Sequence, residues 1–531
     1  MCFTCKNPFS QMTRPSYFSQ MKLMLTCLLH FGKSQRDCSL CAKSKMRFTW
    51  CLSAVSSIAV MLSMLSLSSR YFNNNHLPKP SQNNSYLGTQ NKTLDEVQAA
   101  LDSAINLWSR FTGLNVNNDS TSNAINKGNP VRLKNVLRKA LKGEDIRLVV
   151  LGGSNSAGGF LGADEKSLDG LYFKVFTSWW NKTIGRVTKA FVKEIQLAIG
   201  ATGSYFYAYC YKTFISEDEK IDIVLIEVSV NDGTNVKPLE QFTRQLLAHP
   251  SAPAVLYINL VRNVGPINPS CKNLESFGQD DLARHYEITS LRLREMLCRK
   301  KNGKWRAVIS SMTASDGKHV NGDAHALVAL MMIEYVRSTF KELINDVIKT
   351  VEQVEENKIT NLPRLLFIER ETEALKKPLC WTGKTPDVSK RLHRPSLHLR
   401  VINYKGFLPC LIPKGKSRPL RPDAEGGWCA RKRFSTLKLS ILVPGLTVDD
   451  VSSRSVTVMI FNNGGKAVVW LDENKNKAFE FNRTYSYVQY GTIATRVSPG
   501  QHDVTVKTVR EGMFMFSGVF VGPPDFHLTF P

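Results

Sequence analysis

The segment 148–159, LVVLGGSNSAGG, leads an apolar run into glycines and then presents the hydroxyl of Ser154. A serine hydroxyl is a weak nucleophile at neutral pH and needs a neighbouring base. Asp316 and His319 stand three positions apart in DGKH, and in a helical turn this spacing puts both side chains on one side. There the carboxylate would fix the imidazole tautomer while the imidazole moves the proton. These residue types predict acyl transfer through a serine, provided that the fold brings the two segments together.

Two further strand ends supply hydrogen-bond donors. Asn231 ends the apolar run in VSVNDG, and the segment LAIGATGS offers Gly200 and Gly203. In an open parallel sheet the carboxyl ends of the strands form the edge where ligands bind. The Ser154 amide, a glycine amide and the Asn231 side chain are therefore candidate donors to an oxyanion, each worth about 3 kcal/mol. We favour Gly203 over Gly200. The alternatives are a tight connection or phosphate cradle after the first strand, and a simple turn at 231–233.

In chain order, the blocks GGSNSAGG, LAIGATGS, VSVNDG and DGKH resemble the four motif blocks of the SGNH hydrolases, also called GDSL-type esterases and lipases. The resemblance covers roughly residues 145–340. It implies a three-layer α/β/α domain with a parallel sheet, in which Ser154 is the nucleophile and Asp316 and His319 complete a triad. It also implies that Ser154, Asn231 and a glycine of the second block are the oxyanion donors, and that neither a metal nor an organic cofactor is needed.

The sequence departs from that family pattern at two positions. Gly153 stands where the first block usually has Asp, a residue that is not the catalytic acid. Gln196 is found where the second block usually supplies Asn before a glycine. Because position 156 is Ser, the segment is also not a G-x-S-x-G elbow, which disfavours the α/β-hydrolase fold.

Other residues with possible chemistry receive simpler interpretations. An Asp323–His325 pair is conceivable, but its spacing puts the two side chains on different helix faces, so we interpret His325 as a packed or capping residue. The aromatic run 205–211 and the Trp pair at 179–180 are expected mostly in the core, with a substrate wall as the alternative. Five other histidines show no ligand spacing with cysteines, so no metal site is expected; they are His249, His285, His393, His398 and His502.

The hydrophobic pattern changes along the chain. Continuous Ile, Val and Leu runs alternating with helical segments predict a parallel sheet covered on both faces. The expected strands lie at 146–153, 194–203, 221–233, 252–261 and 305–310, and helices are expected at 131–141, 236–249, 281–297 and from 322 to about 345. Short alternating strands then predict an antiparallel, jelly-roll-like β-sandwich. They lie at 397–402, 436–443, 455–461, 466–472, 502–509 and 513–522.

Residues 48–69 carry no charged side chain. As a helix, this segment would be long enough to cross roughly 30 Å of hydrocarbon. The preceding segment is basic, and this asymmetry predicts a cytosolic N-terminus and a single-pass type II arrangement. A cleaved signal peptide is the alternative. The expected organisation is a cytosolic tail (1–47), a signal anchor (48–69), a stem (70–143), an SGNH-hydrolase-like domain (144–345), a linker (346–380) and a β-sandwich (381–531).

Sequons and cysteines beyond residue 70 fit a glycosylated, disulfide-bonded protein of the secretory pathway, in the Golgi or endoplasmic reticulum lumen or at the cell surface. The acceptors are Asn83, Asn91, Asn118, Asn181 and Asn482. The six cysteines are Cys210, Cys271, Cys298, Cys380, Cys410 and Cys429, whose pairing the sequence leaves open.

A net charge of +25 over 531 residues suits nucleic acid, an anionic membrane or acidic glycans, but basic-aromatic RNA motifs are absent, so no nucleic acid partner is expected. The prediction is a serine hydrolase that cleaves O-acyl esters, with an acylated glycan as the favoured substrate. A lipid esterase or phospholipase and a sugar O-acyltransferase would use the same triad. A catalytically inactive glycan-binding membrane protein is the alternative of another class. The oligomeric state stays open.

Overall fold

The computed structural model places most of the chain beyond residue 93. It describes residues 94–103, 118–159, 161, 167–232, 236–260, 278–297, 311–317, 319–349, 362–368, 378–389, 394–413, 421–445, 454–482 and 488–522. These ranges belong to one compact unit, Asn84–Pro531. The expected tail and the expected signal anchor at 48–69 lie outside them. Within these ranges, no helix is both long enough and apolar enough to cross a membrane.

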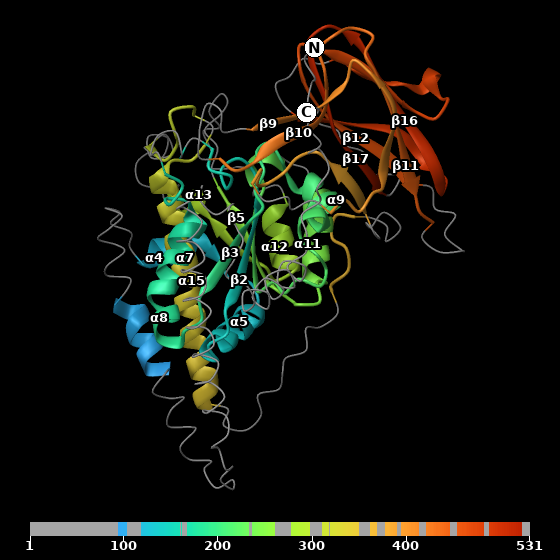
Figure 1. Cartoon of the computed structure of the whole chain (residues 1–531). Coiled ribbons are helices and arrows are strands. Elements are labelled where there is room, and N and C mark those ends of the chain that lie inside the picture. Colours follow the sequence, from blue (N-terminus) through green and yellow to red (C-terminus); the bar gives the residue numbers. More distant parts are fainter. Residues whose placement is uncertain are drawn as a thin grey trace, which may run out of the picture. The chain divides into compact units, whose positions relative to one another are not determined.

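A mixed sheet forms the centre of the first half (Figure 1). Its strand order is β1-β6-β5-β4-β2-β3. The four pairings among β2 to β6 are parallel, and only β1 runs antiparallel to its neighbour β6. The bounds are β1 (Ile125–Asn126), β2 (Ile146–Gly152), β3 (Val192–Gln196), β4 (Ile223–Glu227), β5 (Ala254–Asn259) and β6 (Thr289–Arg292).

Helices cover both faces of this sheet, which explains why its strands are apolar throughout rather than alternating. In β2, Leu148 and Val150 join the core on one face, whereas Val149 and Leu151 join the core on the other. The first face is covered by α5 (Val131–Leu141), α7 (Tyr172–Lys182), α8 (Ile184–Thr188) and α15 (Gly322–Lys349). The second is covered by α9 (Ser204–Phe214), α11 (Lys237–Leu247) and α12 (Gln279–His285). The result is a three-layer α/β/α arrangement.

The helix predicted at 281–297 is wrong in its middle. The chain instead forms α12, strand β6 and α13 (Leu293–Leu297). Glu287 adopts a left-handed backbone with φ of 52°, which ends α12. The residues that follow pair with β5, Thr289 lying opposite Leu256. The open edge of β5 thus overrides a periodicity that fits a helix, while the strand expected at 305–310 lies outside the described residues.

The end of the expected stem packs with the α/β layers. α4 (Asn118–Ala124) leads into β1, which pairs with β6, and α5 contributes buried apolar side chains such as Leu133 and Leu137 to the same core as β2. Short elements that carry apolar residues therefore extend the α/β layers toward the N-terminus.

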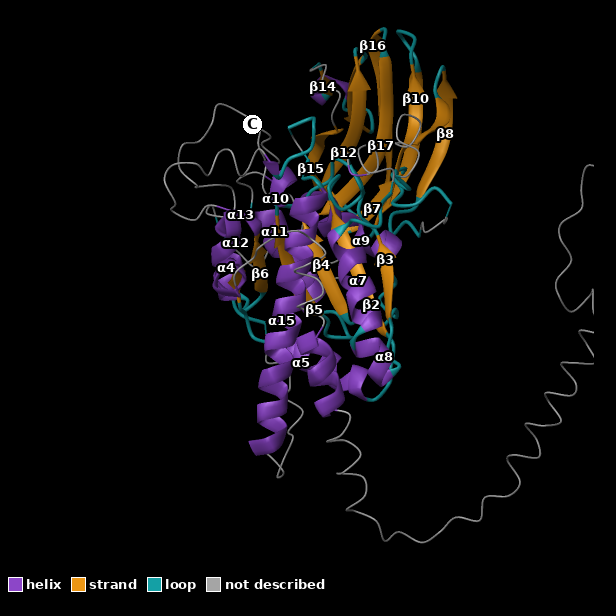
Figure 2. Ribbon diagram, turned by 90° about the vertical axis from the view of Figure 1, so that its left-hand side faces the viewer, coloured by secondary structure: helices purple, strands orange, loops and turns teal. Residues whose placement is uncertain are grey.

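The second half contains two antiparallel sheets that enclose a separate apolar core (Figure 2). One sheet has the order β15-β12-β17-β10-β9, with β7 paired to β17, and the other has the order β14-β13-β16-β11-β8. Their bounds are β7 (Leu379–Thr382), β8 (Leu399–Lys405), β9 (Leu408–Pro413), β10 (Ala424–Ala430), β11 (Thr436–Val443), β12 (Arg454–Asn463), β13 (Lys466–Leu471), β14 (Phe479–Phe481), β15 (Val488–Val497), β16 (Gly500–Arg510) and β17 (Met513–Gly522). This is the antiparallel sandwich, with strands β7, β9, β10, β14 and β15 added to those expected.

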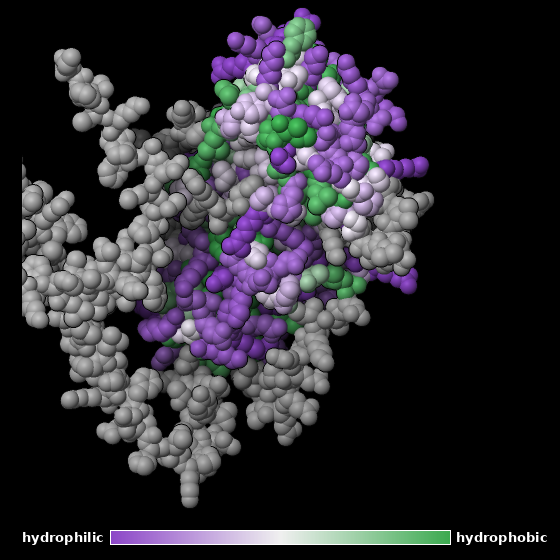
Figure 3. Space-filling model, turned by 45° about the vertical axis from the view of Figure 1, so that its right-hand side comes forward, coloured by the Kyte–Doolittle hydropathy of each residue, from purple (hydrophilic) through white to green (hydrophobic). Residues whose placement is uncertain are grey.

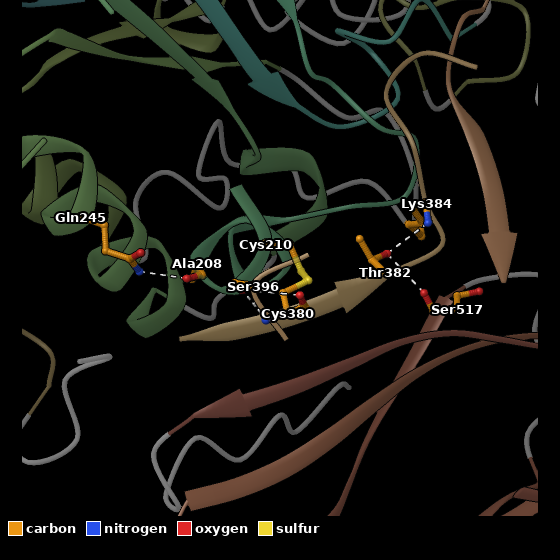
Figure 4. Close-up of a disulfide and its surroundings, with 8 residues drawn as sticks. All are labelled: Ala208, Cys210, Gln245, Cys380, Thr382, Lys384, Ser396 and Ser517. Atoms are coloured by element: carbon orange, nitrogen blue, oxygen red, sulfur yellow. Dashed lines mark hydrogen bonds between the residues drawn. A yellow bond between two sulfur atoms is a disulfide. The ribbon is translucent and has the colours of Figure 1, made fainter. Parts of the chain in front are cut away.

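Aromatic helix α9 is buried between the parallel sheet and the sandwich. The rings of Tyr209 and Phe520 stack with centroids 5.5 Å apart, and Tyr205 contacts Phe520 edge-on at 5.9 Å. A disulfide joins Cys210 of α9 to Cys380 of β7 (Figure 4). The aromatic run at 205–211 is therefore core, as expected, and its side chains do not form an open substrate wall.

The remaining described features are a second disulfide and the hydropathy of the surface. A second disulfide joins Cys410 to Cys429 across β9 and β10, while Cys271 and Cys298 lie outside the described residues. On the face seen in Figure 3 the described atoms are mostly hydrophilic, and hydrophobic ones form separate patches. Tyr404 and Phe434 of the sandwich are among the large apolar side chains that are about half exposed.

Candidate active site

Ser154, His319 and Asp316 meet at the carboxyl edge of the parallel sheet. Ser154 lies in the turn that follows β2, and the other two lie in the segment before α15. The Nε2 atom of His319 is 2.7 Å from Ser154 Oγ, and its Nδ1 atom is 2.6 Å from Asp316 Oδ2. Both distances are those of hydrogen bonds. The imidazole and the carboxylate keep 17% and 14% of their side-chain surface exposed, so the group borders solvent.

Backbone contacts hold the histidine segment against the serine turn. Asp316 Oδ1 accepts a hydrogen bond from the His319 amide at 3.0 Å, so one carboxylate holds both the ring and its backbone. The buried Asn155 accepts a hydrogen bond from the Val320 amide at 3.0 Å. Asn155 therefore ties the turn that carries Ser154 directly to the segment that carries His319.

Two glycines leave room for this arrangement. A Cβ atom at Gly159 would lie 2.8 Å from Cδ2 and 2.9 Å from Nε2 of His319. A Cβ atom at Gly153 would lie 2.0 Å from Nδ2 of Asn231. At position 153 the SGNH hydrolases, which the motif blocks resemble, usually have Asp. In this chain the Asn231 amide occupies the space that a side chain at position 153 would need, which gives a physical reason for glycine there.

The three candidate oxyanion donors follow three different strands. Asn231 Nδ2 donates to the Thr202 carbonyl at 2.6 Å, which uses one of its two hydrogens and leaves the other to point elsewhere. The amides of Ser154 and Gly203 have no hydrogen-bond partner among the described residues. In contrast, the Gly200 amide donates to Asp423 Oδ2 at 2.8 Å. The geometry therefore favours Gly203 over Gly200 as a donor.

Asp232 joins the segment after β4 to the start of α9. Its Oδ1 accepts a hydrogen bond at 2.7 Å from the amide of Ser204, the first residue of α9. The dipole of that helix favours a negative charge at this end. Burial nevertheless raises the pKa of Asp232 to about 7. Residues 231–232 end the short helix α10 (Ser229–Asp232), and Gly233 lies outside the described residues.

Glu227 is a candidate positioning residue that the sequence analysis missed. It ends β4, is fully buried, and accepts hydrogen bonds through Oε2 from the Gly153 amide at 3.2 Å, the Ser156 amide at 3.3 Å and the Ser156 hydroxyl at 3.0 Å. Burial raises its pKa to about 7, although these hydrogen bonds oppose the rise. Glu227 thus holds the turn on both sides of Ser154. The detectable signal was an acid that closes an otherwise apolar strand.

His325 is packed in the core, away from the exposed side of the site. It is fully buried, whereas Asp323 is exposed, so the alternative pair does not form. Its ring stacks on Tyr172 with centroids 5.8 Å apart, and its two ring nitrogens have no hydrogen-bond partner within the described part of the chain. Burial, with a smaller effect of His319, lowers the pKa of His325 to about 3. This histidine stays neutral at physiological pH.

The remaining predicted sites lie elsewhere. Asn118 begins α4, Asn181 lies in α7 and accepts a hydrogen bond from the Val192 amide at 2.8 Å, and Asn482 is exposed after β14. Asn83 and Asn91 lie outside the described residues. Within the described ranges, no group of three or more His, Cys, Asp or Glu side chains is placed to hold a metal ion.

A solved structure of similar fold spans both halves of this chain, and two others match a smaller part of it. A two-domain esterase active on acetylated mannans, co-crystallized with mannopentaose, matches with a TM-score of 0.52 and 20% identity, covering 77% of this chain and 99% of that one. The esterase EstA from Pseudoalteromonas sp. matches at 18% identity and a TM-score of 0.26, covering 38% of this chain and 100% of that one. The acetylxylan esterase Axe2 from Geobacillus stearothermophilus matches at 13% identity and a TM-score of 0.29, covering 37% and 96%. No family model and no curated protein matches the sequence.

Proposed function

We propose that this protein is an SGNH-type serine esterase that cleaves O-acyl esters on carbohydrate. The observation that carries the proposal is the continuous pair of contacts from Ser154 Oγ to His319 Nε2 at 2.7 Å and from His319 Nδ1 to Asp316 at 2.6 Å. A nucleophile, a base and an orienting carboxylate in this order make up the constellation of serine hydrolases.

In the proposed reaction, Ser154 Oγ attacks the acyl carbonyl carbon while its proton passes to His319 Nε2. Asp316 stabilises the imidazolium that forms. The negative charge on the carbonyl oxygen is met by the amides of Ser154 and Gly203 and by the second hydrogen of the Asn231 amide. The sugar hydroxyl then leaves with the proton from His319. Water, deprotonated by the same imidazole, releases the carboxylic acid and restores Ser154.

Two observations support carbohydrate as the alcohol partner. The solved structure that resembles both halves of this chain is an esterase active on acetylated mannans. The sandwich also half-exposes Tyr404, and an aromatic side chain provides an apolar face that can pack on a sugar ring. We therefore place acetylated polysaccharide ahead of lysophospholipid as the substrate class.

The test measures acetate release from acetylated mannan by the purified protein, with 4-nitrophenyl acetate as a small substrate. Ser154→Ala should abolish both activities. Ser338→Ala, which removes a hydroxyl bound only within α15, should leave both unchanged and serves as the matched control. Equal turnover by Ser154→Ala rejects the nucleophile, and consumption of lysophosphatidylcholine in preference to the acetylated glycans moves the substrate to lipid.

We also propose that the enzyme acts in the lumen of the secretory pathway. Residues 48–69 would anchor it in the membrane in a type II orientation. The apolar span and its basic flank support this, and so do two disulfides, which persist in oxidising compartments. Protease treatment of intact microsomes should leave a C-terminal tag uncut. Digestion of that tag without detergent contradicts the topology.

A further inference from the structure

The loop between β3 and α9 is bound by two charged side chains of the sandwich. Asp423 Oδ2 accepts a hydrogen bond from the Gly200 amide at 2.8 Å, and Lys384 Nζ lies 3.3 Å from the Gly200 carbonyl oxygen. Both polar backbone groups of one residue in the hydrolase layers are therefore held by residues about two hundred positions further along the chain.

These two side chains belong to a buried charge cluster. Lys384, Asp423 and Glu425 are almost completely inaccessible to solvent. Lys384 pairs with Glu425 at 3.0 Å, and Arg421 grips Asp423 through Nε at 2.9 Å and a terminal nitrogen at 2.6 Å. Buried charges are costly unless paired and hydrogen-bonded, so each side chain is confined to one geometry.

The bound loop carries parts of the proposed oxyanion site. Two residues after Gly200, the Thr202 carbonyl accepts the hydrogen bond that orients the Asn231 amide at 2.6 Å. The next residue, Gly203, supplies a second proposed donor and caps α9. A Cβ atom at Gly200 would lie 2.3 Å from the Arg421 guanidinium, so the loop and the cluster fit closely. The loop that the sandwich binds thus carries one proposed donor and orients a second.

A disulfide and further hydrogen bonds also join the sandwich to helix α9, which follows this loop. Figure 4 shows the disulfide between Cys210 and Cys380, with Lys384 a few residues beyond on the same segment. The Lys384 amide donates to Thr382 Oγ1, and this hydroxyl donates to the Ser517 carbonyl at 3.2 Å. Helix α9 and the loop before it are therefore fixed to one edge of the sandwich by covalent and polar contacts together.

We propose that the sandwich is a structural part of the catalytic machinery, because Asp423 and Lys384 position the loop 197–203 and with it the oxyanion donors of Gly203 and Asn231. This inference rests on the proposed esterase function. It assigns Asp423 and Lys384 as positioning residues.

The test compares Asp423→Asn and Lys384→Met in the full chain with wild type. Asn keeps the shape of Asp423, but its amide puts a donor against either Gly200 or Arg421. Because loss of one oxyanion donor costs about 10²-fold or more in kcat, we expect kcat for 4-nitrophenyl acetate to fall about tenfold to a hundredfold with little change in KM. Amide hydrogen exchange at residues 200–203 should become faster in both variants.

Asp503→Asn is the matched control, since this Asp pairs with Lys438 at 2.9 Å on the sandwich surface and has no described contact with the loop. It should leave kcat and exchange unchanged. Wild-type kcat and exchange in both cluster variants would overturn the proposal, as would a rise in KM confined to glycan substrates. If Asp423→Asn fails to fold, Lys384→Met decides on the same measurements. An inactive wild type rejects the esterase function, while the exchange measurement still decides whether the sandwich holds the loop.

Discussion

His319 Nε2 lies 2.7 Å from Ser154 Oγ although the two residues are 165 positions apart in the chain. The turn after β2 brings the hydroxyl to the edge of the sheet, and the segment before α15 returns the imidazole to it. Asn155 bonds the Val320 amide and so fixes the two segments to each other within one residue of both reacting groups.

Asp316→Asn should keep the fold but remove most activity. An Asn side chain can donate to Nδ1 of His319, which stabilises the wrong imidazole tautomer and leaves Nε2 unable to accept the serine proton. We expect kcat for 4-nitrophenyl acetate to fall by about 10³-fold or more with an unchanged melting temperature. Activity within tenfold of wild type would mean that Asp316 does not orient the base.

Gly153→Ala should impair the oxyanion side of the site. The added methyl group would start 2.0 Å from Asn231 Nδ2, so the amide must move from its contact with Thr202. We expect at least a tenfold loss in kcat, estimated from the value of one oxyanion donor at about 10²-fold. Gly445→Ala is the control, because a Cβ atom there meets only Pro499, at 3.8 Å. Wild-type kinetics of Gly153→Ala would contradict the placement of Asn231.

Glu227→Gln should change how stability depends on pH. Burial raises the pKa of Glu227 from 4.5 to about 7, so the folded state binds its proton more tightly than the unfolded state. The native protein is therefore favoured below pH 4.5 and loses stability as pH rises toward 7, by about 3 kcal/mol at most. Gln has no proton to lose, so the unfolding free energy of Glu227→Gln should not fall in this way as pH rises. Denaturant unfolding of both proteins between pH 4.5 and 8 checks the prediction, with the exposed Glu480→Gln as control.

A constant difference in unfolding free energy between wild type and Glu227→Gln across that pH range would contradict the assignment. A second measurement tests the positioning role. Because Glu227 holds the amides of Gly153 and Ser156, the variant should lower kcat while KM stays close to wild type.

His325→Phe should remain active. The phenyl ring can take over the stacking on Tyr172, and the two ring nitrogens that it removes have no hydrogen-bond partner among the described residues. We expect kcat within about threefold of wild type, because no ring nitrogen of His325 hydrogen-bonds to a described residue of the site, whereas the larger phenyl ring should lower the free energy of unfolding by about 1–3 kcal/mol. His319→Phe, by comparison, should be inactive. Equal inactivation of the two variants, with both folded, would show that His325 takes part in proton transfer.

The sequence by itself indicated much of the site and the framework that carries it. Apolar runs that end in Gly, Ser or Asn can be recognised as buried parallel strands whose ends meet at one edge, since strand burial requires continuous hydrophobicity. Asp316 and His319 could be paired because they are three positions apart. Their role with Ser154 remains a proposal that the measurements above decide.

Tertiary structure alone revealed that the Gly200 amide is occupied, which supports Gly203 as the proposed donor, and it alone set the environment of each acid. Gly200 is bound by Asp423, and Glu227 bonds the serine turn, through contacts between residues 223 and 74 positions apart. Strand β6 likewise formed within a helical pattern because β5 offered an open edge. Local periodicity reports only which face of an element is apolar. The partners of a buried polar group depend on which distant elements pack beside it, and no spacing along one chain encodes that directly.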